Sequence, residues 1–422
     1  MNKYLFSLGH QPHISIAEIQ AVFSRLQINT STEQPTNSAG RQNNTFFIIK
    51  TKDELNCEEL INKLGGTIKI AKKIIPPTDG PPIRTDSCPR RRIPAEGGKE
   101  NNITDFLAKT PPEFKIQFSL SGPNSKKIAM AVKKELKTMG RSVRYIEPKN
   151  TATILHNKLI KKQGDLTIFE DEIFVTKAIQ PFEEFGERDY KRPGTDSFSG
   201  MLPPKLARIM INLGISNVET RHCLVSTPNN FILLDPFCGS GTVLTEAIDL
   251  GFTNLIGSDI SEKAIEDTKK NIEWQIKSYR LSAISYQSHL VDATKLSTKL
   301  KPNSVDLIVS EPYLGKPLRG NENKLTLQKQ TNDLADLYTK AFKEFYKTLK
   351  KDGIVIFIIP KFKYKDEWVE IDCLDKIKKA GFKIIPLGMD SPPCQGGIKG
   401  GLTYHRPKQH VARVIWGFKI KE

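Results

Sequence analysis

The stretch FILLDPFCGSGT, residues 231–242, constrains the fold of this chain more than any other dozen residues. An apolar run ends at Asp235, and Gly239 and Gly241 then allow a tight turn before a helix that is predicted to run from Thr242 to Leu250. A strand, a glycine turn and a helix N-terminus place backbone N–H groups beside a carboxylate, which suits a ligand that carries both charges. The simpler alternative is an ordinary strand-to-helix turn of a doubly wound sheet.

Three further predicted strands also end in acids. Asp259 closes NLIGSDI and lies 20 residues after Gly239, Asp292 follows SHLV, and Glu311 follows VDLIVS. Each acid alone is better explained as a helix N-cap. Together they indicate a ligand site, because ligands of open α/β sheets bind outside the carboxyl ends of the strands.

Length and composition limit the class of protein. A chain of 422 residues is too long for one ordinary core and suits two or three domains. The apolar runs have strand length and the N-terminus lacks the layout of a signal peptide, so we expect no membrane segment. The six cysteines include no C-x-x-C pair, which favours a reduced, cytoplasmic protein without a metal site.

The net charge of +17 makes a polyanion the leading partner, although a basic balance also serves solubility. Residues 101–180 hold 14 Lys and Arg against 8 Asp and Glu, a net of +6. Residues 1–100 hold 14 against 10, a net of +4. Positive charge is therefore densest ahead of the glycine turn, as a separate nucleic-acid-binding region requires.

Four regions follow from the pattern of elements. Residues 1–78 alternate short strands and helices and are predicted to form a small α+β module. Residues 79–100 are rich in Pro and Gly and are predicted to be a flexible linker, in which the Arg90–Arg92 run is more simply a solvated cluster than a phosphate contact. Residues 101–182 form a second α+β region, and residues 183–422 hold the glycine turn.

The helix predicted over Ser125–Met139 has two faces. Ile128, Val132, Leu136 and Met139 recur at helical spacing on an apolar face, with lysines opposite. Such a face is normally only a soluble surface, but it also offers positive charge to a phosphate backbone. The candidate RNA contacts are Lys126, Lys127, Lys133, Lys134 and, near the C-terminus, Arg406.

The elements after the fourth acid complete an α/β unit. Helices are predicted over Asp333–Leu349 and Trp368–Ala380, around the strand GIVIFIIP. The last two strands, KIIPLG and VARVIWGFKI, suit an antiparallel hairpin at the sheet edge.

The motif Asp-Pro-Phe-Cys-Gly-Ser-Gly-Thr closely resembles the first motif of class I S-adenosylmethionine-dependent methyltransferases that act on amino nitrogens. Over nearly its whole length the chain resembles a THUMP-domain tRNA (guanosine-N2) methyltransferase, the group that modifies guanine 10 of tRNA. The N-terminal ferredoxin-like module of that family is similar to the stretch YLFSLGHQPHISIAEIQAV near the start of this chain. Its THUMP domain is similar to FKIQFSLSG and the lysine-rich helix that follows. Its catalytic domain is similar to two stretches, RDYKRPGTDSFSGMLPPKLARIMINL and YHRPKQHVAR.

The resemblance implies a fold and a cofactor site. The expected fold is α/β: a Rossmann-like class I methyltransferase domain with a seven-stranded sheet and an antiparallel C-terminal hairpin, preceded by α+β ferredoxin-like and THUMP modules. The first motif would contact the methionine end of S-adenosyl-L-methionine, Asp259 its ribose and Asp292 its adenine amino group. The predicted cofactor-binding residues are Asp235, Gly239, Gly241, Thr242, Asp259, Ile260, Asp292 and Ala293.

The fourth acid departs from the pattern of the family. Its relatives carry Asp-Pro-Pro-Tyr, whereas this chain has Glu311-Pro312-Tyr313-Leu314, with a longer acid and an aromatic ring one position earlier. By resemblance, the Glu311 carboxylate and the Pro312 carbonyl would accept from the reacting amine. Tyr313 is a candidate to stack on an extruded base, and a core tyrosine is an equally good interpretation.

Several readings stay open at this point. The same chemistry could act on adenine N6 of RNA or DNA, or on ribosomal guanine N2. A tRNA-binding protein with a degenerate methyltransferase domain is the non-enzymatic alternative. Some eukaryotic members of the family need a small zinc-binding partner, so an activator subunit is an option for a chain otherwise expected to be a monomer. Tyr404 and Arg406 could contact RNA, although surface roles are the simpler interpretation.

Overall fold

The structure is a computed structural model that divides into two compact units. It describes residues 1–33, 45–74, 99–195, 201–218, 231–279, 284–318, 320–388, 400–407 and 409–421. Unit 1 comprises Met1–Ser7, Thr30–Ile61 and Thr67–Gln180. Unit 2 comprises Leu8–Asn29, Asn62–Gly66 and Pro181–Glu422.

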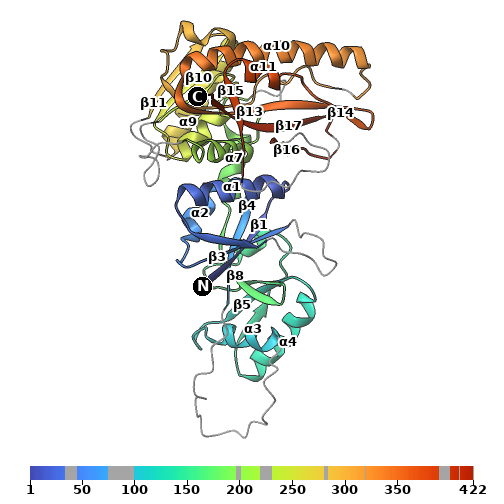
Figure 1. The fold of residues 1–422 in the computed structure, drawn as a ribbon. Helices are drawn as coiled ribbons and strands as arrows, with labels where there is room; N and C mark the ends of the chain where they lie inside the picture. Colours follow the sequence, from blue (N-terminus) through green and yellow to red (C-terminus); the bar gives the residue numbers. More distant parts are fainter. Residues whose placement is uncertain are drawn as a thin grey trace. The chain divides into compact units, whose positions relative to one another are not determined.

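Unit 1 is built on one eight-stranded sheet with helices packed against it (Figure 1). The strand order is β2-β3-β1-β4-β8-β7-β5-β6. Its strands are β1 (Asn2–Leu8), β2 (Thr30–Glu33), β3 (Phe46–Thr51), β4 (Thr67–Lys73), β5 (Ile116–Ser121), β6 (Val143–Tyr145), β7 (Asp165–Phe169) and β8 (Glu172–Ile179). Its helices are α2 (Cys57–Lys63), α3 (Lys99–Ala108), α4 (Ser125–Thr138) and α5 (Thr151–His156).

The two predicted front modules share this sheet, because β4 of the first pairs with β8 of the second in antiparallel register. The helix α1 (Pro12–Arg25), which lies within the predicted 1–78 module, belongs instead to unit 2. Most of the predicted linker 79–100 lies outside the described residues, and its last two residues begin α3. The boundaries at 78, 100 and 182 stay predictions.

The helix α4 has the predicted apolar face, with one correction. Val132 and Leu136 are buried beside Ala129, and Ile128 packs against the same core. Met139, predicted to lie on this face, is 48% exposed because the helix ends one residue earlier and Met139 is its C-cap.

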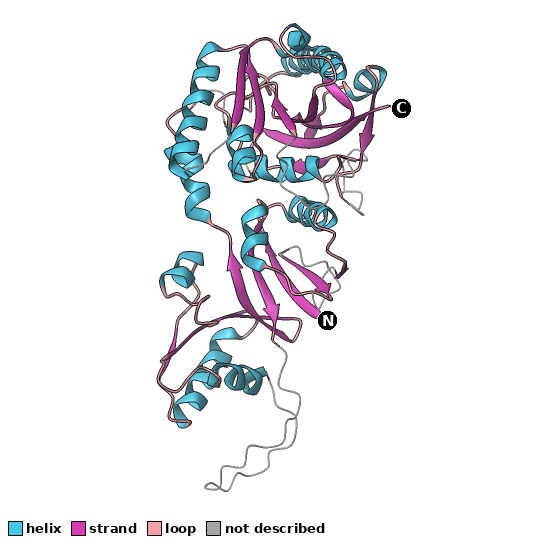
Figure 2. Ribbon diagram, turned by 90° about the vertical axis from the view of Figure 1, so that its left-hand side faces the viewer, coloured by secondary structure: helices cyan, strands magenta, loops and turns pink. Residues whose placement is uncertain are grey.

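Unit 2 contains a second sheet of nine strands with helices on both faces (Figure 2). Seven strands follow the order β11-β10-β9-β12-β13-β17-β15, in which the first five are parallel. Strand β17 lies antiparallel between β13 and β15. The expected seven-stranded Rossmann-like sheet with an antiparallel C-terminal end is therefore confirmed, and two short strands extend it.

The strands of unit 2 are β9 (Ile232–Asp235), β10 (Asn254–Asp259), β11 (Ser285–Leu290), β12 (Val305–Ser310), β13 (Leu349–Tyr364), β14 (Glu367–Val369), β15 (Phe382–Ile385), β16 (Leu402–Tyr404) and β17 (Val411–Ile420). Besides α1, its helical elements are α6 (Phe182–Gly186), η1 (Glu187–Lys191), α7 (Pro204–Ile215), α8 (Thr242–Asp249), α9 (Glu262–Tyr279), η2 (Ala293–Thr298), α10 (Lys324–Thr348) and α11 (Leu374–Lys379).

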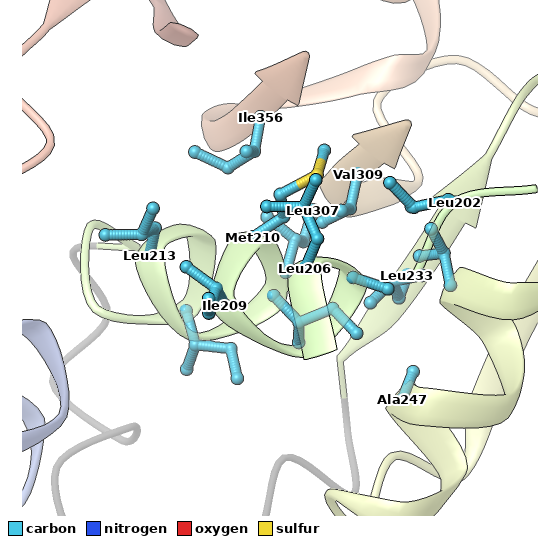
Figure 3. Close-up of a cluster of buried hydrophobic side chains, with 14 of the residues drawn as sticks. Leu202, Leu206, Ile209, Met210, Leu213, Leu233, Ala247, Leu307, Val309 and Ile356 are labelled. Atoms are coloured by element: carbon cyan, nitrogen blue, oxygen red, sulfur yellow. The ribbon is translucent and has the colours of Figure 1, made fainter. Parts of the chain in front are cut away.

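The core of unit 2 has two layers because successive strand residues face opposite sides of the sheet. Leu307 and Val309 of β12 point toward α7, and Ile308 between them joins the opposite layer. Figure 3 shows the first layer, where Leu206, Ile209, Met210 and Leu213 of α7 meet Leu233, Leu307, Val309 and Ile356 from three adjacent strands. Helices α10 and α11 cover the second layer. The two buried layers fix the register of the strands that end at the predicted site.

Two predicted helices differ from the structure. Helix α10 begins at Lys324 rather than Asp333, where the Asn323 side chain accepts from Thr326 N at 2.8 Å and caps the N-terminus. Trp368, predicted to start a helix, lies in β14, which pairs antiparallel with the end of β13. Lys365 turns the chain there with a φ of 54°, and the following helix is the short α11.

A buried ion-pair network joins α7, α8 and η1. Glu246 accepts from Arg188 Nε at 2.6 Å and from Arg208 Nε at 2.8 Å, and Asp249 pairs with both arginines. The guanidinium carbons of Arg188 and Arg208 each lie 4.7 Å from the centre of the Phe185 ring. Because every charge has a partner, the network holds the segment before α7 against α8 without leaving a buried charge unpaired.

Helix α1 joins this unit through a second buried acid. Glu18 accepts from Gly65 N at 2.8 Å, Gly66 N at 2.7 Å and Asn212 Nδ2 at 2.7 Å. Burial raises the pKa of Glu18 to about 7, against the opposing effect of these hydrogen bonds. Among the described helices, none is long and apolar enough to cross a membrane.

We expect Glu246→Ala to lower the free energy of unfolding of this protein by about 3–5 kcal/mol, because it leaves two buried guanidinium groups without their shared carboxylate. Denaturant unfolding monitored by tryptophan fluorescence measures this. The matched control is Glu266→Ala, which removes an exposed pair with Lys270 and should change stability little. Equal effects of the two substitutions would contradict the assigned role of Glu246.

Candidate functional site

The site begins at the turn between β9 and α8, where the sequence permits backbone angles that other residues resist. Gly239 has a φ of 51° and Gly241 a φ of 80°, both in the left-handed region. Cys238 N donates to Ser258 O of β10 at 2.9 Å, and Gly241 N donates to Cys238 O at 2.7 Å. The turn is therefore closed on itself and tied to the neighbouring strand.

Asp235 lies at the bottom of this turn and is buried. Its Oδ1 accepts from Ser310 Oγ at 2.7 Å and from Phe237 N at 3.2 Å. Burial raises the pKa of Asp235 to about 7, and the nearby carboxylates of Asp259 and Glu311 contribute in the same direction. The carboxyl therefore loses its proton close to neutral pH, and a cation beside it would favour the ionised form.

Asp259 connects the end of β10 to the glycine turn. Its Oδ2 accepts from Gly239 N at 3.0 Å, and its Oδ1 accepts from Ser261 N at 2.9 Å. Ile260, next in the chain, is 73% exposed, which is unusual for a large apolar side chain and leaves an uncovered surface beside the acid.

Asp292 follows β11, where Val291 N donates to the Asp259 carbonyl at 3.0 Å. One oxygen of Asp292 accepts from Thr294 N at 2.8 Å and caps η2. Ala293 beside it is buried. The N-cap interpretation of this acid is therefore correct in the structure, and its carboxylate keeps further capacity to accept.

Glu311 follows β12 and forms an ion pair that the sequence did not predict. Arg413 Nε of β17 donates to Glu311 Oε1, and Arg413 Nη2 lies 3.4 Å from Oε2. Both side chains are mostly buried. Burial alone would lower the pKa of Arg413, but the Glu311 carboxylate outweighs it and raises that pKa.

The two residues after Glu311 differ in exposure. Pro312 is buried, whereas Tyr313 is 51% exposed and its carbonyl accepts from Tyr338 Oη at 2.7 Å. Tyr313 is thus not the core tyrosine that the sequence left open; the buried ring under this loop is Tyr338.

The segment before α7 also reaches the glycine turn. Asn271 of α9 donates from Nδ2 to the carbonyls of Gly194 and Ser240 at 2.8 and 2.7 Å, and its Oδ1 accepts from Gly194 N at 2.7 Å. A Cβ on Gly194 would lie 2.7 Å from Asp267 O, so only glycine fits this approach. Arg192, two residues earlier, donates from Nη1 to Thr242 Oγ1 at 2.6 Å.

The structure thus brings together the predicted acids of four parallel strands and the glycine turn. The RNA-contact candidates come from both units. In unit 1, Lys126, Lys127 and Lys134 are exposed on α4, Lys133 is half-buried, and Lys126 lies 3.8 Å from Glu147. In unit 2, Arg406 is exposed and donates to Tyr404 Oη at 2.9 Å.

Sequence reasoning missed four residues of the site: Arg192, Asn271, Ser310 and Arg413. Two of them carried a signal. Arg413 is a charge inside the apolar run VARVIWGFKI, and Arg192 opens Arg-Pro-Gly just before the helix that precedes the first strand of the sheet. Asn271 and Ser310 are ordinary residues for their elements, and only the fold shows their contacts.

Two family models match the chain. The model described as "Methyltransferase domain" matches residues 229–381, and the one described as "DNA methylase" matches residues 43–270. The first covers all four predicted acids.

Two relatives and one solved structure extend this result. A tRNA (guanine(10)-N2)-dimethyltransferase of Methanothermobacter thermautotrophicus is 30% identical over 35% of this chain, and the match spans only 38% of that relative. A probable tRNA (guanine(10)-N2)-dimethyltransferase of Methanothermococcus thermolithotrophicus is 31% identical over 30% of this chain and 68% of its own length. The crystal structure of TrmN from Thermus thermophilus aligns with a TM-score of 0.51 at 15% identity, over 99% of each chain, and supports the fold.

The sheet order, the glycine turn and the methyltransferase-domain match define a class I methyltransferase fold. More particularly, the chain belongs to the family of the tRNA (guanine(10)-N2)-dimethyltransferases, and to the broader DNA methylase family whose model covers more than half of it. The family of tRNA (guanine-N2) methyltransferases expected from the resemblance is confirmed, whereas its THUMP domain stays a prediction.

We expect Asp235→Asn to change how stability depends on pH. Burial raises the pKa of the carboxyl in the native protein to about 7, whereas the unfolded chain has the ordinary aspartate pKa of 3.8. The native state therefore binds more protons between these values, so wild-type stability should fall relative to the variant as pH rises through this window. Urea unfolding of both proteins across the window measures the difference. A difference that is constant with pH would contradict the raised pKa.

Proposed function

We propose that this protein transfers a methyl group from S-adenosyl-L-methionine to the exocyclic N2 of guanine, most specifically guanine 10 of tRNA. The observation that carries the proposal is the convergence of Asp235, Asp259 and Glu311 at one sheet edge around a glycine turn. The names of the two relatives supply the substrate.

The residues present fit the cofactor. Asp235 and the N–H groups of the turn suit the charged methionine end, and the Asp259 oxygens retain lone pairs for two ribose hydroxyls. The exposed Ile260 side chain offers an apolar surface to the adenine ring, and Asp292 can accept from its amino group. The bound cofactor would supply an electrophilic methyl on a sulfonium.

The chain's own contribution is to orient the amine. A guanine N2 lone pair is delocalised into the ring, so an acceptor on its N–H must draw it toward the methyl. Glu311 Oε1 is taken by Arg413 Nε, whereas Oε2 has only a long contact of 3.4 Å and keeps its capacity to accept. With the Pro312 carbonyl, Oε2 would hold the amine and stabilise the positive charge that develops on nitrogen.

Arg413 accounts for the longer acid at this position. Glu311 has one more rotatable bond than the aspartate that the family carries, so it has more orientations to lose. A two-point contact with a rigid guanidinium restricts those orientations. Arg413 is therefore a positioning residue, and the half-exposed ring of Tyr313, two residues after the acid, would stack on an extruded base.

The polyanionic substrate fits the charge of the chain. The exposed lysines of α4 offer phosphate contacts, which position RNA without reading its sequence. A THUMP role for residues 101–182, a ferredoxin-like role for residues 1–78, a cytoplasmic location, a small activator subunit and a monomeric state remain part of this proposal.

A second candidate substrate is an adenine amino group, and the match to a model described as DNA methylase motivates it. Mass spectrometry of nucleosides from tRNA incubated with the protein and cofactor separates the two. Methylguanosine supports the proposal, and methyladenosine alone overturns the guanine assignment. A degenerate, non-enzymatic protein would produce neither and would not bind the cofactor in calorimetry.

We expect Glu311→Ala to reduce methyl incorporation into tRNA by about 100-fold or more, because the amine loses its acceptor. Calorimetry with S-adenosylmethionine serves as the control, since Glu311 does not contact the glycine turn and binding should persist. Turnover close to that of the wild type would remove the assigned role.

We expect Arg413→Lys to lower kcat for tRNA methylation several-fold and Arg413→Met to lower it further. Lysine keeps the charge but cannot make the two-point contact. The affinity for the cofactor should stay unchanged in both variants. A higher KM for tRNA with an unchanged kcat in both variants would contradict this role. Arg413 would then bind RNA rather than position Glu311.

A further inference from the structure

Three arginines are buried in the part of unit 2 that packs beneath the glycine turn: Arg188, Arg192 and Arg208. Arg188 and Arg208 each pair with Glu246 and Asp249. Arg192 differs, because no described carboxylate lies within ion-pair distance of it. A buried guanidinium without an anion is costly, since desolvation is not offset by a partner charge.

The contacts of Arg192 show where an anion is missing. Its side chain is 4% exposed, and its Nη1 donates to Thr242 Oγ1, a neutral acceptor. Its Nη2 contacts the Met201 sulfur, a weak acceptor, and its Nε has no hydrogen-bond partner among the residues that the structure describes. The Nε–Nη2 edge is the one on which a carboxylate forms a forked pair of hydrogen bonds. Burial lowers the pKa of Arg192 and outweighs the carboxylates of Asp189 and Glu246, which lie beyond ion-pair distance and act in the opposite direction.

The position of Arg192 is fixed from two sides. Asn271 holds both the N–H and the carbonyl of Gly194, and the same Nδ2 group binds Ser240 O in the glycine turn. Thr242, which accepts from Arg192, is the first residue of α8. The guanidinium is therefore anchored at the N-terminus of that helix, where the backbone also favours an anion.

We propose that Arg192 recognises the α-carboxylate of the methionine moiety of S-adenosylmethionine. The inference rests on the proposed cofactor site and adds a residue that none of the motif acids or glycines supplies. It gives the pocket a means to select: ligands with the amino-acid end satisfy Arg192, and adenosine thioethers without a carboxylate leave it unpaired.

The test compares ligands as well as variants of the full chain. Calorimetry measures the affinity of wild type, Arg192→Gln and Arg192→Lys for S-adenosylhomocysteine and for 5′-methylthioadenosine, which lacks the carboxylate. Glutamine keeps a donor for Thr242 without the charge, and lysine keeps the charge without the fork. We expect Arg192→Gln to weaken S-adenosylhomocysteine by about 10- to 100-fold, the range for a hydrogen bond to a charged group. Arg192→Lys should fall between.

The affinity for 5′-methylthioadenosine should be the same in all three proteins. Equal weakening of both ligands would overturn the inference, because Arg192 would then act only by shaping the turn through Thr242. Unchanged binding of both ligands to the variants would also overturn it. If the wild type binds neither ligand, the proposed cofactor site fails first, so the two failures are distinguishable.

A matched control is Lys191→Gln, which removes an exposed cation next to Arg192 whose ion pair in the described part of the chain is with Glu187, four residues earlier. It should bind both ligands as the wild type does. A loss of S-adenosylhomocysteine binding in this control equal to that of Arg192→Gln would show that general positive charge, rather than the buried guanidinium, attracts the carboxylate.

Discussion

The hydrogen bond from Gly239 N to Asp259 Oδ2 joins the two features on which the site depends. It ties the turn after β9 to the acid that ends β10, so the glycine backbone and the neighbouring carboxylate occupy fixed relative positions. The second bond, from Cys238 N to Ser258 O, extends the strand pairing into the turn. Because both β9 and β10 are buried between two apolar layers, neither can shift register without exposing a core face.

Several charged side chains around the turn form ion pairs with one another. Glu246 and Asp249 bind two arginines below the turn, and Arg413 binds Glu311 beside it. Among the described residues no cation pairs with Asp235, and burial raises its pKa to about 7. Neither Asp235 nor Arg192 forms an ion pair within the described part of the chain, and a ligand that brings both charges would complement the two groups.

The sequence predicted those parts of the site that local backbone rules determine. Short stretches of sequence show both a strand that ends in an acid and a turn whose glycines adopt left-handed backbone angles. The positions of Asp235, Gly239, Gly241 and Asp259 at the strand ends and in the turn could therefore be predicted from the sequence. The pairing of Glu311 with Arg413 spans 102 positions and depends on β17 lying next to β13. No local pattern encodes that contact. The shared sheet of residues 1–73 and 116–179 was missed for the same reason.

The substitution of an acid by its longer homologue illustrates how a distant strand can preserve a site. A glutamate at the end of β12 would have several orientations of similar energy, and a randomly oriented carboxylate would hold an amine poorly. The guanidinium on β17 selects one orientation and leaves Oε2 with the weaker contact. The longer side chain of Glu311 and the positive charge of Arg413 therefore act together. The six residues of β12 are all buried, so the strand that carries position 311 is fixed in the core while the two side chains set the orientation of the carboxylate.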